Sequence, residues 1–359
     1  MKSLEERRPA ASSVLYGVQF LRFVAALAVV VYHANLVSIK FIPGTLLPGA
    51  DAILELGASG VHVFFVISGF IMVYTATGKS GWKEAVAFWL RRATRIYPIY
   101  WIIALSYLTL YGLFFSGYTL SISAAIRALL LVPGWEALII GPAWTLSYEV
   151  FFYICFGASL LFRPGQSLWV LTAVFAILVG TGLWWPLPIG VVGNPLLLEF
   201  IAGAWIARLL PGMTWRPRFS GIALLAVGTL GLAAGLFVNH IAIPKVILWG
   251  PPSILLVAGV ALLDKSSGAG PAFSKVSVLG DASYVLYLAH ILILDIVMSL
   301  LVWSGSVPDF RLVSILIGVA ASAAAAILIH TAIERPLLGN LRKWVKFKTT
   351  APPPPPSLR

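Results

Sequence analysis

Charged residues and cysteine are scarce in this sequence. Only 11% of the 359 residues are Asp, Glu, Lys or Arg, and 60% are hydrophobic, whereas soluble globular proteins carry about 25% charged residues. This composition excludes a soluble globular chain and predicts an integral membrane protein. The single cysteine, Cys155, lies in an apolar run. The sequence therefore holds no disulfide framework, and its cysteine usage indicates no redox compartment.

Internal repeats and long polar segments are also lacking. The missing repeat argues mildly against a transporter built from two related halves, and the missing polar segment leaves no room for a separate soluble domain. What fills the chain is a series of apolar runs of about 20 residues, the length that crosses a bilayer. They predict an all-α fold, a polytopic bundle of about ten transmembrane helices. The expected spans are residues 14–37, 60–77, 97–116, 142–162, 168–185, 194–210, 220–238, 245–263, 283–302 and 311–333.

The basic residues are distributed unevenly between the two sides of these spans. With the N-terminus inside, 20 of the 25 Lys and Arg residues fall in inner segments, four fall in outer loops and one lies within the first span. This positive-inside pattern predicts that both termini are cytoplasmic. It also assigns the net charge of +12 to a membrane lipid surface and not to nucleic acid. The expected parts are a cytoplasmic segment 1–13, a ten-helix membrane domain 14–336, and a basic, Pro-rich, disordered cytoplasmic tail 337–359.

Two ionisable residues lie in the first expected span, LRFVAALAVVVYH. Arg22 and His33 are eleven residues apart, which is about three helical turns or 16 Å of rise, so both project from nearly the same face. Charged groups in the hydrocarbon are costly and usually face a partner or a cavity. This face therefore presents a cation near the inner leaflet and an imidazole towards the outer one.

Further ionisable residues predict two polar clusters along a passage through the bundle. Glu149 and Glu199 are expected at the outer depth of His33, and we expect Glu149 to meet His33. His290 is expected at the inner level of Arg22. A packing role and a chemical role are both open for His33 and Glu149, whereas His290 is more typical of interhelical packing.

Three other histidine and arginine groups have simpler interpretations. His62 is expected at the outer rim, and His330 with Glu334 is expected to anchor the last helix at the inner interface. Arg92 and Arg95 fall in an expected cytoplasmic turn before the third span, three residues apart, where they can fork onto phosphate oxygens. Ordinary positive-inside anchoring explains the same pair equally well.

Six stretches of the sequence occur together in a characteristic order. They are FLRFVAALAVVVYH, GVHVFFVISGF, RRATRIYP, AWTLSYEVFFY, LGDASYVLYLAH and IERP. In order and position the set resembles the membrane-bound acyltransferase 3 family, over nearly the whole chain from about residue 17 to 336. The resemblance implies a ten-helix protein of the bacterial inner membrane. Such proteins O-acylate cell-surface carbohydrates such as lipopolysaccharide O-antigen, exopolysaccharide, lipochitooligosaccharide or periplasmic glucan.

The resemblance also implies roles for single residues. His33 matches the essential histidine of the first helix, and Arg22 matches the arginine paired with it. Arg92 and Arg95 match the arginine pair associated with use of the acyl donor, and Glu149 matches the acid of the fourth-helix motif. The residues expected to support the passage or the substrate are Ser68, Gly69, Phe70, Glu199, Tyr284, Tyr287 and His290. Glu199 is included only because of its expected depth, whereas the others match family motifs.

The sequence departs from the family pattern in two places. Gln19 and Phe20 stand where many relatives have an acidic residue and glycine. No hydrolase-like domain follows the tenth span, unlike in some larger relatives. We therefore expect the chain to act alone or to pass its acyl group to a partner acyltransferase on the outer side.

The resemblance, together with the placement of these residues, implies an O-acyltransferase that uses no metal, with acetyl as the acyl group by family frequency. Acetyl-CoA is the expected donor, with its phosphates on Arg92 and Arg95 and its arm passing Arg22. His33 is expected to take a proton from a carbohydrate hydroxyl, with Glu149 orienting the imidazole. The alternative from another class of function is a transporter or flippase for a glycan or small acid, because buried charges also mark transport routes.

Overall fold

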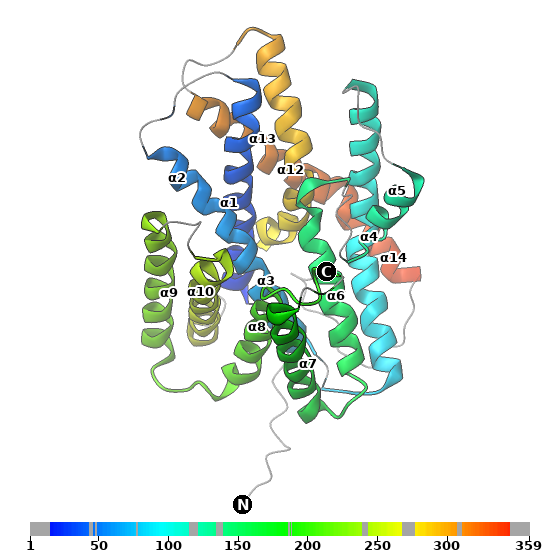
Figure 1. The fold of residues 1–359 in the computed structure, drawn as a ribbon, viewed down its shortest axis with the longest axis vertical. Coiled ribbons are helices and arrows are strands. Elements are labelled where there is room, and N and C mark those ends of the chain that lie inside the picture. The colour runs from blue at the N-terminus through cyan, green and yellow to red at the C-terminus, as the bar shows by residue number, and fades with distance from the viewer. Residues whose placement is uncertain are drawn as a thin grey trace, which may run out of the picture.

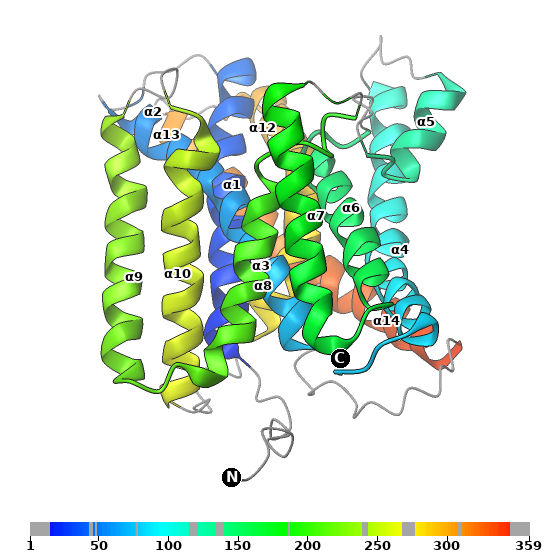
Figure 2. The same ribbon diagram turned by 60° about the horizontal axis from the view of Figure 1, so that its bottom comes forward.

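A computed structural model describes residues 15–42, 46, 49–76, 78–114, 121–133, 139–185, 187, 189–238, 243–267, 277–306 and 311–344. Over these residues the regular structure is helical, without a β-strand, which confirms the predicted all-α class. The helices form a bundle whose long members run side by side (Figures 1 and 2). They are α1 Tyr16–Phe41, α2 Ala50–Glu55, α3 Gly60–Tyr74, α4 Trp82–Phe114, α5 Ile122–Leu129, α6 Trp144–Ser159, α7 Pro164–Trp184, α8 Leu197–Leu209, α9 Pro217–Ala234, α10 Lys245–Ser267, α12 Ser277–Trp303, α13 Arg311–Ile329 and α14 Arg335–Trp344.

The bundle has two distinct ends. We call the end at which α1 begins the inner end; α14 lies there too, and Figure 2 shows both near the bottom. The start of α1 is fixed at this end by Asp264 of α10, whose carboxylate oxygens accept hydrogen bonds from the backbone N–H groups of Gly17 and Val18 at 2.9 and 3.0 Å. A carboxylate in this position satisfies N–H groups that a helix start leaves unpaired. The positive-inside pattern predicts that the inner end faces the cytoplasm.

Eight helical segments of the described chain are long and apolar enough to cross a membrane. The fourth and sixth expected spans form shorter helices, α6 of 16 residues and α8 of 13 residues. At about 1.5 Å per residue neither can cross a hydrocarbon core of about 30 Å by itself. More than half of the residues in each are buried, so both belong to the interior of the bundle.

Helical structure begins before two of the expected spans. The second expected span is preceded by α2 and a 3₁₀ turn at Leu56–Ser59, which lead directly into α3. The third begins at Trp82, and Pro98 lies inside its 33-residue helix. The cytoplasmic turn expected around Arg92 and Arg95 is therefore wrong, because both arginines are part of α4 itself.

The C-terminal end of the described chain also differs from its prediction. After α13 the chain passes through a π-helical turn, His330–Glu334, and continues as α14 to Trp344. The tail that was expected to be disordered from residue 337 thus begins as a helix. The expected cytoplasmic segment 1–13 and the rest of the tail lie outside the described residues.

Helices α3 and α8 are in backbone contact. A Cβ atom at Gly69 would overlap the carbonyl oxygen of Phe200, and one at Gly203 would overlap that of Val66. Small residues commonly permit such approach between membrane helices. The pair also stacks Phe65 on Phe200, with ring centroids 4.7 Å apart, and this aromatic contact belongs to the main core. Close packing therefore holds α3 against α8.

Candidate active site

His33 of α1 lies against His290 of α12 within the bundle. The Nδ1 atom of His33 is 3.1 Å from Nε2 of His290, and the two ring centroids are 4.9 Å apart. His290 is fully buried, whereas His33 keeps partial exposure. The sequence placed His290 at the level of Arg22, and this was wrong. The ring of His33 is directed back along α1 to the carbonyl of Val29, 3.0 Å away, and so meets a residue nearer the middle of the bundle.

The carbonyl groups beside this pair fix which nitrogen atoms carry protons. Nδ1 of His290 lies 3.1 Å from the carbonyl oxygen of Leu286, which can only accept, so Nδ1 donates and Nε2 of the neutral ring accepts. His33 then donates from Nδ1 towards His290 Nε2 and the Val29 carbonyl. The lone pair of His33 Nε2 remains, and within the described residues no protein group is bonded to it. A neutral imidazole in this tautomer is a proton acceptor.

Glu149 does not contact His33, contrary to the prediction. Its Oε1 atom accepts hydrogen bonds from Ser68 Oγ at 3.1 Å and from the hydroxyl of Tyr153. The cause is the depth at which α6 begins. The hydroxyl of Tyr287 on α12 donates to the carbonyl of Pro142 at 3.2 Å, so the turn before α6 lies beside the middle of α12 and not at the outer surface. Glu149 is consequently displaced towards the inner end.

Around Glu149 a lower cluster of charged and polar groups forms. Arg22 is within electrostatic range of Glu149, Arg95 and Asp281, and Arg92 is within range of Tyr153 and Glu149. Arg92 and Arg95, three residues apart on α4, therefore border one cluster. Helices α1, α3, α4, α6 and α12 all contribute to this lower cluster.

The tyrosines of the late motif connect the two levels. Tyr287 accepts a hydrogen bond from Thr145 Oγ1 at 2.8 Å, and its ring centroid is 6.0 Å from that of His290. Tyr284, one turn closer to the inner end, donates to the carbonyl of Ile96 at 3.0 Å. Of the mid-membrane SGF element, Ser68 faces Glu149, Gly69 contacts α8 and Phe70 is fully buried. The element thus joins the lower cluster to the α3–α8 contact.

Glu199 and His62 form a separate buried pair. His62 Nδ1 lies 2.6 Å from Glu199 Oε1, and the two residues are 5% and 2% exposed. The rim position predicted for His62 is therefore wrong. Its carboxylate partner, Glu199 of α8, is 137 residues away in the sequence, so residue spacing could not predict the contact. Glu199 contacts neither His33 nor Glu149 by any hydrogen bond among the described residues, so it supports α3 and α8 instead of lining the passage.

An outer polar group escaped the sequence analysis. Arg311 at the start of α13 donates to Asn35 Oδ1 at 3.2 Å and pairs with Asp51 Oδ1 at 3.1 Å, and Asn35 donates to the same carboxylate oxygen at 3.2 Å. Asn35 lies two residues beyond His33 on α1. The positions of Asp51 and Arg311 in loops between spans gave no signal for this contact. In the described part of the chain, no group of three or more His, Cys, Asp or Glu residues is arranged to hold a metal ion.

Comparisons with known proteins show the family of this chain. The family model Acyl_transf_3, described as an acyltransferase domain, matches residues 15–331. The chain is 33% identical over 299 residues to the exopolysaccharide production protein ExoZ of Rhizobium meliloti (strain 1021), covering 79% of this chain and 90% of that protein. It is 28% identical over 353 residues to the acyltransferase MdmB of Streptomyces mycarofaciens, covering 84% and 86%. No solved structure matches the chain. The chain therefore belongs to the acyltransferase 3 family, and it is a multi-pass membrane acyltransferase.

Proposed function

We propose that this acyltransferase is an O-acetyltransferase of the bacterial inner membrane. It moves an acetyl group from acetyl-CoA at the inner end to a hydroxyl of a cell-surface or periplasmic carbohydrate at the outer end. The name of the relative ExoZ, an exopolysaccharide production protein, favours a carbohydrate acceptor. The single observation that carries the proposal is the His33–His290 hydrogen bond, which leaves His33 Nε2 ready to accept a proton.

The lower cluster supplies the cations that a donor with several phosphates requires. Arg92 and Arg95 hold the phosphates in this scheme, and Arg22 lies along the route towards His33. Acetyl-CoA supplies an activated acetyl thioester when it is bound. Its pantetheine arm has about the length of four extended residues, roughly 14 Å, which is close to the rise of about 16 Å between Arg22 and His33 along α1. An arm of this length brings the thioester towards the histidine pair.

His33 acts as the general base in the transfer. Its Nε2 atom takes the proton from the acceptor hydroxyl as the hydroxyl oxygen bonds to the thioester carbonyl carbon. The carbon–sulfur bond then breaks, and the imidazolium returns the proton to the departing thiolate. His290 takes the orienting role first expected of Glu149, since it accepts the Nδ1–H bond of His33 and keeps that ring in one tautomer.

The experiment that tests this proposal replaces His33 with alanine. We expect insertion into the membrane to be unchanged and the acetyl content of the surface carbohydrate, measured by mass analysis, to fall by about 10²-fold or more, because general-base catalysis typically supplies 10²–10⁴-fold. Cells lacking the chain give the lower limit of the acetyl content, and cells with the unaltered chain give the upper limit. Full acetylation by His33→Ala would remove His33 from the chemistry. Unchanged modification with altered glycan export in cells lacking the chain would support the transporter alternative instead.

A further inference from the structure

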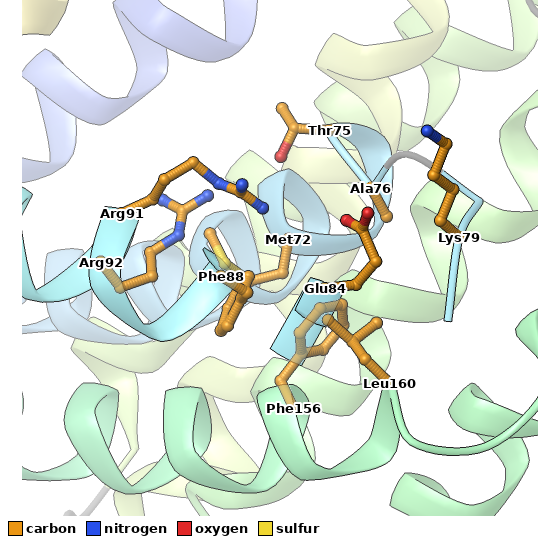
Figure 3. A pocket seen from close by; sticks show the side chains of 10 residues that line it. All are labelled: Met72, Thr75, Ala76, Lys79, Glu84, Phe88, Arg91, Arg92, Phe156 and Leu160. Carbon is orange, nitrogen blue, oxygen red and sulfur yellow. The ribbon is translucent and has the colours of Figure 1, made fainter. Parts of the chain in front are cut away.

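A small cleft opens at the inner end between the end of α3, the start of α4 and the end of α6. Its charged lining residues are Lys79, Glu84, Arg91 and Arg92, and its apolar wall includes Phe88 and Phe156. Figure 3 shows the two arginine side chains on one side of the cleft, Lys79 on the opposite side and Glu84 between them. Only Arg92 belongs to the arginine pair singled out from the sequence.

The cleft carries three positive charges against one negative charge. Glu84 is an electrostatic neighbour of Arg91, but within the described residues neither Arg91 nor Arg92 forms an ion pair. The Nε atom of Arg92 is buried and has no hydrogen-bond partner there. A buried guanidinium that is only partly compensated favours an anionic ligand, and its fork geometry suits phosphate oxygens.

Arg92 contacts both the cleft and the lower cluster. The guanidinium of Arg92 lies over the rings of Phe88, a cleft residue, and Tyr153, a cluster residue, at 5.4 and 5.5 Å from their centroids. Tyr153 in turn donates to Glu149. A molecule that contacts Arg92 in the cleft therefore contacts a side chain that also borders the lower cluster.

We propose that this cleft binds the nucleotide end of the acyl donor, with Lys79 and Arg91 on its 3′-phosphate and Arg92 towards its pyrophosphate. This assignment rests on the proposed function. A phosphate monoester carries roughly 1.5 to 2 negative charges near neutral pH, enough to engage two cations on opposite sides of a cleft. Glu84 opposes the phosphate by like charge and sets a limit on affinity. The cleft thus distinguishes coenzyme A from donors that lack the 3′-phosphate.

Equilibrium binding to the full-length protein in phosphatidylcholine nanodiscs tests this assignment without an identified acceptor. The probes are CoA, 3′-dephospho-CoA and pantetheine. We expect the unaltered protein to bind CoA about tenfold more tightly than 3′-dephospho-CoA, since a charge-assisted hydrogen bond contributes a factor of this order or more. Lys79→Gln and Arg91→Gln should each reduce that preference several-fold, and Glu84→Gln should increase CoA affinity. The ratio of two probes within one variant does not depend on the fraction of folded protein.

Lys83→Gln is the matched control. Lys83 is exposed on the same end of α4 and does not line the cleft, so the same loss of charge should leave the preference unchanged. Equal affinity of the unaltered protein for CoA and 3′-dephospho-CoA would overturn the assignment of the cleft. It would leave acetyl-CoA in place as the proposed donor. Displacement of CoA by added phosphatidylglycerol, without that preference, would assign the cleft to a lipid phosphate and also overturn it. Failure to bind CoA at all would remove both the cleft assignment and the proposed donor.

Discussion

The histidine that the first helix carries obtains its chemical character from a partner 257 residues away. His33 alone could be a packing residue, but His290 accepts from its Nδ1 at 3.1 Å and is itself fixed by the Leu286 carbonyl. Because Nδ1 of His33 donates to His290, the lone pair on Nε2 of His33 is not used within the histidine pair. A single buried residue therefore decides the tautomer, as the orienting carboxylate does in a catalytic triad.

Substitution of His290 tests this orienting role. We expect His290→Leu to lower kcat by about 10²-fold with little change in the KM for the donor, because the base loses its orientation and not its binding partners. His290→Gln offers a carbonyl oxygen that can accept the Nδ1–H bond and should recover part of the rate. Steady-state kinetics on detergent-solubilised protein separates kcat from KM. Equal rates for the leucine and glutamine variants would contradict the hydrogen-bond explanation.

Helix spacing predicted that Arg22 and His33 share a face, but it could not supply their partners. The depth of Glu149 was misjudged because the apolar run around residues 142–162 was taken to start at the membrane surface. In the structure the chain enters the bundle before α6 begins, and Tyr287 holds the Pro142 carbonyl. Hydropathy reports how apolar a segment is, not how deep its first residue lies.

At the scale of helices, the order of the apolar segments followed from the sequence, and their ends and lengths did not. Helix α4 extends fifteen residues before the expected start at residue 97, because polar residues on an exposed helical face lower the hydropathy without ending the helix. The contact between α3 and α8 could not be predicted from the sequence either. It depends on Gly69 and Gly203, two glycines among the 32 of the chain.

The α3–α8 contact provides a test of packing. Gly203→Ala places a Cβ where the Val66 carbonyl oxygen lies, so the helices must separate, and we expect a loss of about 1–3 kcal/mol of stability. Gly180→Ala is the control, because a Cβ on Gly180 of α7 meets nothing within 4 Å and alanine favours the helix. The Tm in detergent, followed by size-exclusion chromatography after heating, measures both. A Gly203→Ala protein with the same Tm as the unaltered chain would contradict the close packing.

At the scale of the whole molecule, the bundle joins two ends of different chemistry. The inner end carries the cleft with Lys79, Arg91 and Arg92, and the lower cluster that Arg92 borders includes Arg22. Further along α1 stands the His33–His290 pair, with the polar contact of Asn35, Asp51 and Arg311 beyond it. The family was predictable from ordered motifs and the all-α class from composition and hydropathy. The division into a lower cluster and a histidine pair, in contrast, required the packing of five helices.

Sidedness of the transfer tests the central claim most directly. The unaltered protein and His33→Ala are each placed in sealed membrane vesicles with the acceptor carbohydrate on the outer side, and radiolabelled acetyl-CoA is supplied from one side at a time. We predict label in the carbohydrate only when the donor is at the inner side and His33 is present. Equal labelling from donor supplied at the outer side would contradict a route through the bundle.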